Sequence, residues 1–480
     1  MFILIFTIFT RCTKTTPENQ DFFPGKYPGK AIAKVNSEKI VLSNEAIAAE
    51  WSLQDNSIVL DKIVNKYNYQ TAELSQITLF AIEFPDKEML TNQDFKLQGS
   101  LQIQNPATTD SLPTKALRFP GKEIVGRFVS NNNELEIIWK AQLRNGSNYI
   151  RQNIEIKSVI RAVKIKKISF FDGKLDGAVY AGAVLGSPID YKDFFFGFEH
   201  PIAHSKALLS RKISKIQQEP IDISEIIDAH GDYTISVEHG VGASFNIQSV
   251  SLLEDGQVVS KNEHPLNGEN GNSLYPLKLK EYNPKRKYQI HATIDNCPIK
   301  ESGAFHIFRK TDGLLNFFVN RADELSLGES ISEWSVIGVS PPGQKRRAFQ
   351  YYLERERARP YKQFLHYNSW WDLFHVNSEK LIKCMNAWNE KFINPYNVQL
   401  QSFCFDDGWD DLDSLWYFDP VNFPNGFAPQ AELSKKYNSG IGIWMSPFGG
   451  YGGKQRHRII SASAKGFETN DKGLSLAGKN

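Results

Sequence analysis

Residues Phe403–Trp416 read FCFDDGWDDLDSLW. The segment begins with apolar residues that predict the end of a buried strand, and two aspartates, Asp406 and Asp407, follow at once. In a βα barrel, the residues just past the C-terminal end of a strand face the mouth of the active site. The segment therefore predicts a parallel strand that presents adjacent carboxylates to a binding site.

These carboxylates suit the recognition of a sugar. A carboxylate accepts strong hydrogen bonds, so it can bind two neighbouring hydroxyl groups at once. Gly408 allows the backbone to turn sharply, and the indole of Trp409 offers an apolar face that stacks on a sugar ring. On its own, however, an acidic pair of this kind is more typical of a surface loop, so the carbohydrate interpretation depends on the further motifs described below.

Two other interpretations of the acidic segment stay open. The first is a surface loop in which Asp406 or Asp410 caps a helix, since Asp is a favoured N-cap residue. The second is a calcium loop that includes Asp411 and Asp413. The position of Gly408 and the lack of a closing Glu depart from the EF-hand pattern, so we expect no metal ion here.

The sequence around this segment alternates between strand and helix patterns. Apolar runs at His366–Trp371, Val398–Phe405 and Ile441–Met445 predict three strands. Apolar residues at helical spacing over Leu381–Phe392 predict a helix between the first two strands, and Pro429 opens a second helix. Alternating strands and helices are typical of a parallel sheet or barrel.

The chain is therefore predicted to be a multi-domain protein. Residues 31–325 carry short, alternating or β-branched runs separated by turn signals, which predict a large antiparallel β-sandwich. Residues 326–362 are predicted to form a connector. Residues 363–480 are predicted to be the N-terminal part of a TIM (β/α) barrel catalytic domain with about three strands, because a whole barrel needs about 250 residues.

Residues 1–30 are predicted to be a signal-like segment and tether. The first ten residues, MFILIFTIFT, are too few to span a bilayer and resemble the apolar region of a secretory signal. Cys12 after this run suggests a lipoprotein anchor, although Thr10-Arg11 fits that signal poorly. We expect the protein to be exported, as a periplasmic, extracellular or lipid-anchored protein. We expect no transmembrane span.

The composition of the chain limits the kinds of binding partner that we expect. The net charge is +2, so no global field attracts nucleic acid or an anionic membrane. The 4 cysteines form no CxxC pair and have no histidine at zinc-ligand spacing, so a metal site of that kind is not expected. Aromatic residues reach 12%, which suits β-sheet cores and sugar-binding clefts alike. The oligomeric state is left open.

Three further motifs accompany DDGW. Residues 368–372 (NSWWD) close the first predicted strand, residues 419–427 (DPVNFPNGF) follow the DDGW motif, and residues 442–447 (GIWMSP) close the third strand. In this order and spacing, the motifs resemble the first three barrel strands of clan D glycoside hydrolases, the α-galactosidase (melibiase) group. Residues 144–151 and 193–201, within the predicted sandwich, resemble bacterial enzymes of this kind more loosely.

The resemblance implies roles for individual residues. Asp406 and Asp407 match the acidic pair that grips the hydroxyl groups of the sugar. Trp444 matches a tryptophan that lines the sugar subsite, Trp409 belongs to the same motif as the acidic pair, and Trp371 or Trp370 forms another wall. For Glu199 and His200, the sequence favours hydrogen-bonded polar residues in a turn over an acid/base pair.

The resemblance also implies a retaining glycoside hydrolase that acts on terminal α-galactosyl or related α-linked sugars, without a cofactor. Its nucleophile and acid/base follow later barrel strands, so we expect them after residue 480 and none in this chain. The chain is then an inactive fragment of the enzyme. The alternative is a non-catalytic carbohydrate-binding surface protein that uses the β-sandwich.

Overall fold

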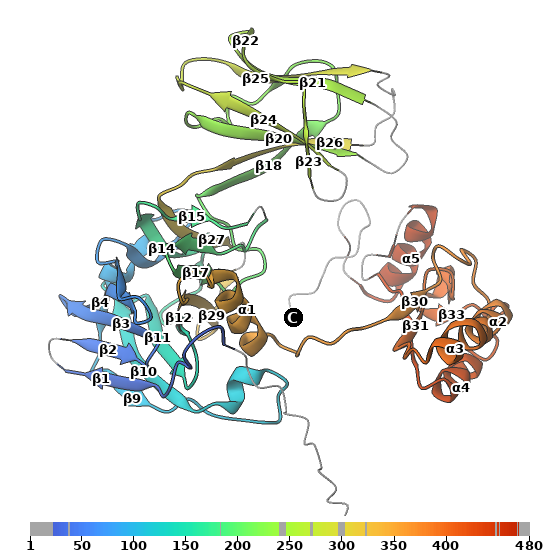
Figure 1. The fold of residues 1–480 in the computed structure, drawn as a ribbon, viewed down its shortest axis with the longest axis horizontal. Helices are drawn as coiled ribbons and strands as arrows, with labels where there is room; N and C mark the ends of the chain where they lie inside the picture. Colours follow the sequence, from blue (N-terminus) through green and yellow to red (C-terminus); the bar gives the residue numbers. More distant parts are fainter. Residues whose placement is uncertain are drawn as a thin grey trace, which may run out of the picture. The chain divides into compact units, whose positions relative to one another are not determined.

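The computed structural model describes residues 23–36, 39–182, 184–239, 246–268, 272–295, 303–321, 324–446, 449–450, 452–467 and 469. The chain divides into two compact units, Met1–Pro360 and Tyr361–Asn480. The first unit is built almost entirely of strands, and the second combines strands with helices (Figure 1). The predicted signal run and Cys12 lie outside the described residues. No helix in the described part of the chain is long and apolar enough to cross a membrane.

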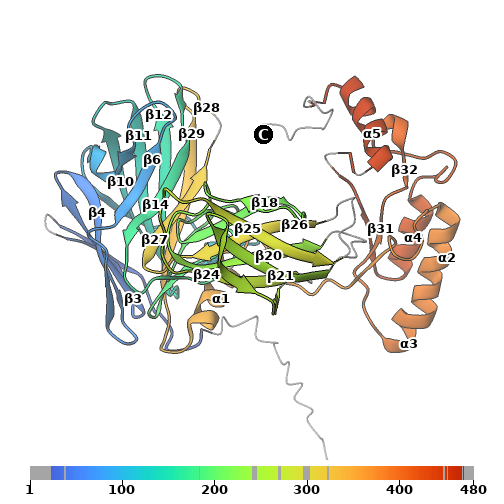
Figure 2. The ribbon, with the colours of Figure 1, turned by 90° about the horizontal axis from the view of Figure 1, so that it is seen from above.

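The larger core of the first unit lies between antiparallel sheets, which Figure 2 shows from above. One sheet has the order β15-β16-β17-β29-β12-β11-β10-β8, with β9 also paired to β10; a second has the order β1-β2-β3-β4-β5. Smaller sheets are β27-β14-β6-β7 and β13-β28. Their strands are β1 (Ile32–Val35), β2 (Ile40–Ser43), β3 (Ile47–Gln54), β4 (Ser57–Asn65), β5 (Gln70–Glu73), β6 (Thr78–Glu83), β7 (Leu90–Thr91), β8 (Phe95–Leu97), β9 (Gln102–Gln104), β10 (Gly121–Ser130), β11 (Leu135–Arg144), β12 (Tyr149–Ser158), β13 (Val163–Lys164), β14 (Lys167–Lys174), β15 (Val179–Tyr180), β16 (Ile189–Tyr191), β17 (Phe194–Phe198), β27 (Leu314–Asn320), β28 (Glu324–Leu325) and β29 (Ser330–Val339). Short 3-10 turns are η1 (Asn92–Asp94) and η2 (Lys115–Arg118).

Alternation along the strands builds this core. In β11, Ile137 and Trp139 are fully buried, whereas Lys140 between the buried positions stays partly exposed. Trp139 meets Trp51 of β3 edge-on, with ring centroids 5.6 Å apart, so the two large sheets pack through their tryptophans. The antiparallel β-sandwich expected from the sequence is confirmed.

A second core lies within the range predicted as one sandwich. Strands between β17 and β27 form two further antiparallel sheets, β18-β26-β20-β24-β23 and β19-β25-β21-β22, around their own cluster of apolar residues. These strands are β18 (Leu208–Lys215), β19 (Ile221–Asp222), β20 (Gly231–His239), β21 (Asn246–Glu254), β22 (Gln257–Asn262), β23 (Leu266–Asn267), β24 (Ser273–Leu279), β25 (Tyr288–Asp295) and β26 (Gly303–Lys310). Residues 31–325 therefore hold two sandwiches. The sequence predicted one, because strands of both sandwiches show the same alternation and alternation does not reveal which sheet a strand joins.

Helix α1 (Lys345–Glu356) packs against the first unit and is bound to it by a cluster of ion pairs and hydrogen bonds. Arg151 of β12 donates from Nε to both carboxylate oxygens of Glu199, at 2.9 and 3.0 Å, and from Nη1 to Glu356 at 2.9 Å. The hydroxyl of Tyr352 on α1 also donates to Glu199, at 2.8 Å. Glu199 is therefore a hydrogen-bonded structural residue, as the sequence favoured, and its carboxylate is fully engaged.

The second unit contains a parallel sheet with the order β30-β31-β34, and helices connect its strands. In the described part of the chain this sheet has three strands and does not close on itself, so the predicted barrel remains a proposal. The elements are β30 (His366–Asn368), α2 (Ser378–Trp388), the π-helical turn η4 (Asn389–Ile393), α3 (Asn394–Tyr396), β31 (Ser402–Phe405), β32 (Asp410–Asp411), η5 (Leu412–Ser414), β33 (Tyr417–Phe418), α4 (Ala428–Lys436), β34 (Gly440–Ile443) and α5 (Gly452–Ala464).

Its helices lie close to the predicted ranges. The helical pattern of Leu381–Phe392 corresponds to α2 and η4, and Leu381 and Met385 are buried against the sheet. The helical stretch continues past Asn394-Pro395 to Tyr396 and ends at Asn397, whose φ of 50° is left-handed. Pro395 thus lies inside this continuous helical run, which ends one residue later at Tyr396.

We predict that Arg151→Met destabilises the first unit strongly. The substitution leaves Glu199 and Glu356 without their shared cation, and breaking such a largely buried pair costs about 3–5 kcal/mol of unfolding free energy. Urea unfolding followed by far-UV circular dichroism measures the loss. Arg161→Met is the control, because Arg161 is exposed and its surface pair with Glu134 is worth at most about 1 kcal/mol. Equal losses of unfolding free energy in Arg151→Met and Arg161→Met would contradict the structural role given to the Arg151 ion cluster.

Candidate functional site

The carboxyl ends of β30, β31 and β34 meet at one edge of the parallel sheet. Asn368 pairs in register with Cys404, and Cys404 pairs with Gly442. The residues that follow these strands therefore lie together, although they are far apart in sequence. They enclose a pocket of about 340 Å³. The pocket is lined by Asn368, Trp370, Trp371, Asp406, Asp407 and Trp444.

Asp406 is held in place by neutral donors. The side-chain amide of Asn368 donates to its Oδ2 at 3.0 Å, and the backbone N–H of Asp407 donates to its Oδ1 at 2.8 Å. The backbone N–H of Asp406 itself donates to Ser369 Oγ at 2.9 Å. Each carboxylate oxygen can accept about two hydrogen bonds, so the Asp406 carboxylate keeps acceptor capacity on the pocket side.

Asp407 has two cationic partners from α5. Lys454 Nζ donates to Oδ2 at 3.0 Å, and Arg458 Nη2 donates to Oδ1. Partial burial disfavours the ionised form, but the hydrogen bonds from Arg458 and Lys454 outweigh this effect and lower the pKa of Asp407. Asp407 is thus a paired anion whose two oxygens are both engaged.

Arg458 is completely buried and joins several parts of the site. Its Nε and Nη2 donate to the two oxygens of Asp410, at 2.8 and 2.7 Å, and its Nη1 donates to the carbonyl of Gly449 at 3.2 Å. The guanidinium carbon lies 5.6 Å from the ring centroid of Trp444. Burial disfavours the charge on Arg458, yet its hydrogen bonds to Asp410 and Asp407 raise its pKa.

The predicted tryptophans fall into two groups. Trp444 and Trp371 line the pocket, and 83% of Trp371 is exposed. Trp409 does not line it: this residue is 3% exposed, packs against Trp416 and donates from Nε1 to the carbonyl of Trp444 at 3.1 Å. The structure places Trp409 beneath the site, because the turn at Gly408 directs the chain back into the core.

The remaining aspartates of the acidic segment have structural partners. Asp411, rather than Asp406 or Asp410, caps the 3-10 turn η5 by accepting from the backbone N–H of Asp413 at 3.1 Å. Asp410 binds Arg458, and Asp413 lies 3.1 Å from His457. Within the described ranges, no group of three or more His, Cys, Asp or Glu side chains is placed to hold a metal ion.

Sequence reasoning missed Lys454 and Arg458. Both residues lie on α5, which spans Gly452–Ala464. Residues four apart share one face of a helix, so the spacing of Lys454 and Arg458 could have indicated a cationic face. Nothing in the sequence indicated that this face meets the DDGW loop.

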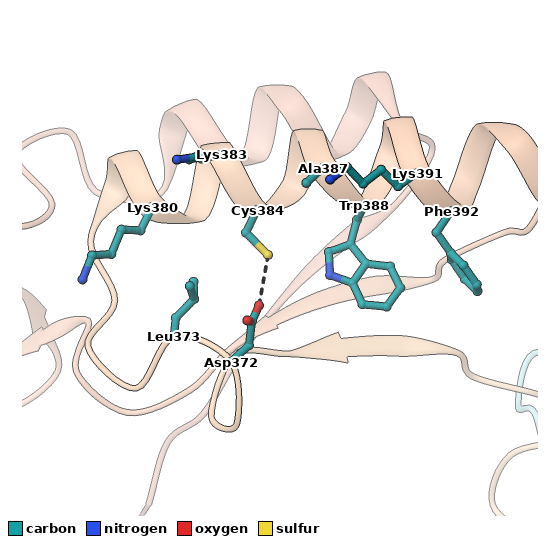
Figure 3. Close-up of a pocket in the computed structure, with 9 residues that line it drawn as sticks. All are labelled: Asp372, Leu373, Lys380, Lys383, Cys384, Ala387, Trp388, Lys391 and Phe392. Atoms are coloured by element: carbon teal, nitrogen blue, oxygen red, sulfur yellow. Dashed lines mark hydrogen bonds between the residues drawn. The ribbon is translucent and has the colours of Figure 1, made fainter.

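A larger groove of about 630 Å³ lies along α2 and differs in character (Figure 3). Cys384 points from the helix toward Asp372, and Trp388 projects from the same side of the helix. Asp372 already accepts from the hydroxyl of Tyr367 at 2.7 Å and lies 3.6 Å from the sulfur of Cys384, whose pKa is raised by burial. The groove is mainly apolar, so it offers less to a sugar than the pocket at the strand ends.

Comparison with known proteins gives matches in structure only. No family model matches the chain, and no curated protein matches its sequence. The galactosidase domain of the α-galactosidase–sucrose kinase AgaSK matches with a TM-score of 0.44 and 12% identity, over 87% of this chain and 57% of that one. The GH36 α-galactosidase AgaB from Geobacillus stearothermophilus matches with a TM-score of 0.43 and 11% identity, over 87% and 57%.

An α-galactosidase from Lactobacillus brevis matches with a TM-score of 0.40 and 10% identity, over 87% of this chain and 55% of that one. The chain therefore spans a little over half the length of these solved structures. The matching structures are α-galactosidases, the class that the sequence motifs resemble.

We predict that Asp407→Asn lowers stability in a pH-dependent way. The pKa of Asp407 is depressed below its ordinary value of 3.8, so its stabilising effect is complete above that value and is lost as pH falls through the depressed pKa. The difference between the parent chain and the variant should be about 1.5–3 kcal/mol at neutral pH, as expected for charged hydrogen bonds.

Urea unfolding at several pH values, followed by tryptophan fluorescence, measures this difference. It should stay constant from about pH 7 to 5 and shrink below about pH 4. Asp413→Asn is the control, because the Asp413 side chain is 83% exposed. A difference that grows on acidification would contradict the paired state of Asp407.

Proposed function

We propose that residues 361–480 form the sugar-binding part of a glycoside hydrolase catalytic domain that acts on terminal α-galactosyl or related α-linked sugars. The observation that carries the proposal is the pocket at the strand ends. It combines a carboxylate with spare acceptor capacity, Asp406, with the indole walls of Trp444 and Trp371. A pyranose presents a rim of hydroxyl groups and an apolar face, which match these two kinds of surface.

The size and position of the pocket support the same proposal. Its volume of about 340 Å³ lies at the small end of the range for ligand pockets, as suits one sugar ring. Its residues come from the C-terminal ends of three adjacent parallel strands, where βα-barrel enzymes carry their active sites. We propose that β30, β31 and β34 are consecutive strands of such a barrel, with β30 and β34 pairing to further strands at their outer edges.

Neither of the two pocket carboxylates takes part in bond cleavage in this proposal. Retaining hydrolysis needs a nucleophile and an acid/base about 5–5.5 Å apart that flank the scissile bond. Asp406 and Asp407 follow the same strand, and Asp407 is held by two cations. The proposal therefore assigns hydrolysis to other carboxyl groups, and it assigns hydroxyl recognition to the pocket.

We predict that the chain binds methyl α-D-galactopyranoside and that Asp406→Asn weakens this binding about tenfold or more. Losing the charge of an acceptor for sugar hydroxyls removes about 1.5–3 kcal/mol, and 1.4 kcal/mol is tenfold. Ligand-observed NMR titration measures the dissociation constant, and Asp413→Asn on the same loop is the control. Binding that is unchanged by both Asp406→Asn and Trp444→Ala would instead favour the sandwich as the sugar-binding part.

We further expect no hydrolysis of an aryl α-galactoside by the purified 480-residue chain, because Asp406 and Asp407 follow the same strand and Asp407 is held by two cations. Release of the chromogenic phenol, followed over hours at high protein concentration, measures this activity. Turnover by the parent chain that Asp406→Ala abolishes would show that the chain hydrolyses a sugar bound in this pocket, and would contradict the expectation. Turnover that persists in Asp406→Ala would show that the hydrolysis does not depend on this pocket.

A further inference from the structure

Two cations from α5 reach the loop that follows β31. Lys454 and Arg458 lie four residues apart on one face of the helix and bind opposite oxygens of Asp407. Lys454 is partly exposed, whereas Arg458 is fully buried. The buried cation therefore has no solvent to stabilise it, and its position depends on its carboxylate partners.

We infer that Arg458 is a positioning residue of the sugar pocket, which holds Asp407 and Trp444 in place and leaves Asp406 as the carboxylate that accepts hydrogen bonds from the sugar. The inference rests on the proposed function, since it assigns separate tasks to the two adjacent aspartates of that site. Arg458 touches no pocket space itself and acts through its neighbours.

The hydrogen bonds of the two aspartates support separate tasks. Both oxygens of Asp407 bind cations, and a sugar hydroxyl would have to compete with an ammonium or a guanidinium group for them. Among the described residues, the Asp406 carboxylate accepts from an amide and a backbone N–H, which are neutral donors. A hydroxyl group can therefore add to Asp406 without displacing an ion pair.

The shape of Arg458 explains why one residue can organise several loops. Its planar fork binds Asp410 through two parallel hydrogen bonds and still reaches Asp407 and the carbonyl of Gly449. Gly449 lies in the segment after β34, so the guanidinium ties the ends of β31 and β34 to α5. A lysine provides the charge but not this fork.

Close packing around Gly450 adds a separate observation. A Cβ atom at Gly450 would lie 2.8 Å from Arg458 Nη1 and 2.8 Å from the Trp444 ring, and the φ of Gly450 is +85°. Such distances leave no space for a side chain, and this φ favours glycine. The backbone at Gly450 thus packs closely against both Arg458 and Trp444, and this packing holds the Trp444 indole at the pocket wall.

Removing Arg458 therefore changes the charge balance of the pocket as well as its packing. The charged groups that face it are Asp407 and Asp410 on the loop after β31, with Lys454 beside them on α5. Without the guanidinium, and with Asp410 neutralised as well, Asp407 keeps Lys454 as its cation and lies beside the negative charge of Asp406. Its proton affinity then rises, since nearby like charges disfavour the ionised form.

The test compares Arg458→Lys with the double variant Arg458→Met/Asp410→Asn. The double variant removes the buried cation together with its main counterion, so it avoids leaving an uncompensated charge in the core. Arg456→Met, at an exposed position of the same helix, is the matched control. Dissociation constants for methyl α-D-galactopyranoside are measured from about pH 4 to 7.5, the range over which a displaced aspartate would titrate, and thermal unfolding establishes that each variant is folded.

We expect Arg456→Met to bind like the parent chain at every pH. The folded double variant should bind about tenfold more weakly at pH 7, and its remaining affinity should fall on acidification at a higher pH than in the parent. Arg458→Lys should also bind more weakly at pH 7, but it should keep the parental pH profile because the charge is retained. This difference would not arise from a purely structural role.

Two failures can be told apart. If the parent chain does not bind the galactoside, the proposed function fails, and the inference fails with it. If the parent binds, and the folded double variant has the same dissociation constant and the same pH profile, the proposed function stands and the role of Arg458 is overturned.

Discussion

The buried guanidinium of Arg458 is the interaction on which the second unit's site depends. A cation without solvent is costly unless carboxylates surround it, and here Asp410 and Asp407 supply two negative charges. Asp410 accepts hydrogen bonds from Nε and Nη2 of Arg458. Asp407, which lines the pocket, accepts a further hydrogen bond from Nη2. The adjacent aspartates of the DDGW motif both line the pocket but differ in their partners: Asp407 is paired with two cations, and Asp406 accepts hydrogen bonds from neutral donors.

The sequence indicated the fold where local patterns determine it. Alternation predicted the antiparallel sandwich, and alternating strand and helix patterns predicted the parallel sheet. Because parallel strands end at one edge, the motifs after β30, β31 and β34 could be placed together in advance, and Asp406 and Trp444 do line one pocket. The acidic pair could be placed at this edge of the sheet because it directly follows the end of a parallel strand.

Contacts between distant segments could not be predicted in the same way. Trp409 follows the acidic pair directly, but the turn at Gly408 buries it, and no periodic pattern indicates the direction of a side chain after a strand ends. The partnership of Arg458 with Asp410 joins residues 48 positions apart across a loop and a helix. Likewise, the two sandwiches of the first unit share one alternation pattern, so their separate cores emerge only from the strand pairing.

A crystal structure of the chain in complex with methyl α-D-galactopyranoside would test this account most directly. The account predicts a pyranose ring beside Trp444, with a ring hydroxyl within hydrogen-bonding distance of the Asp406 carboxylate and with Asp407 still bound to Arg458. A sugar seated on either sandwich, or one that displaces Arg458 from Asp407, would contradict it.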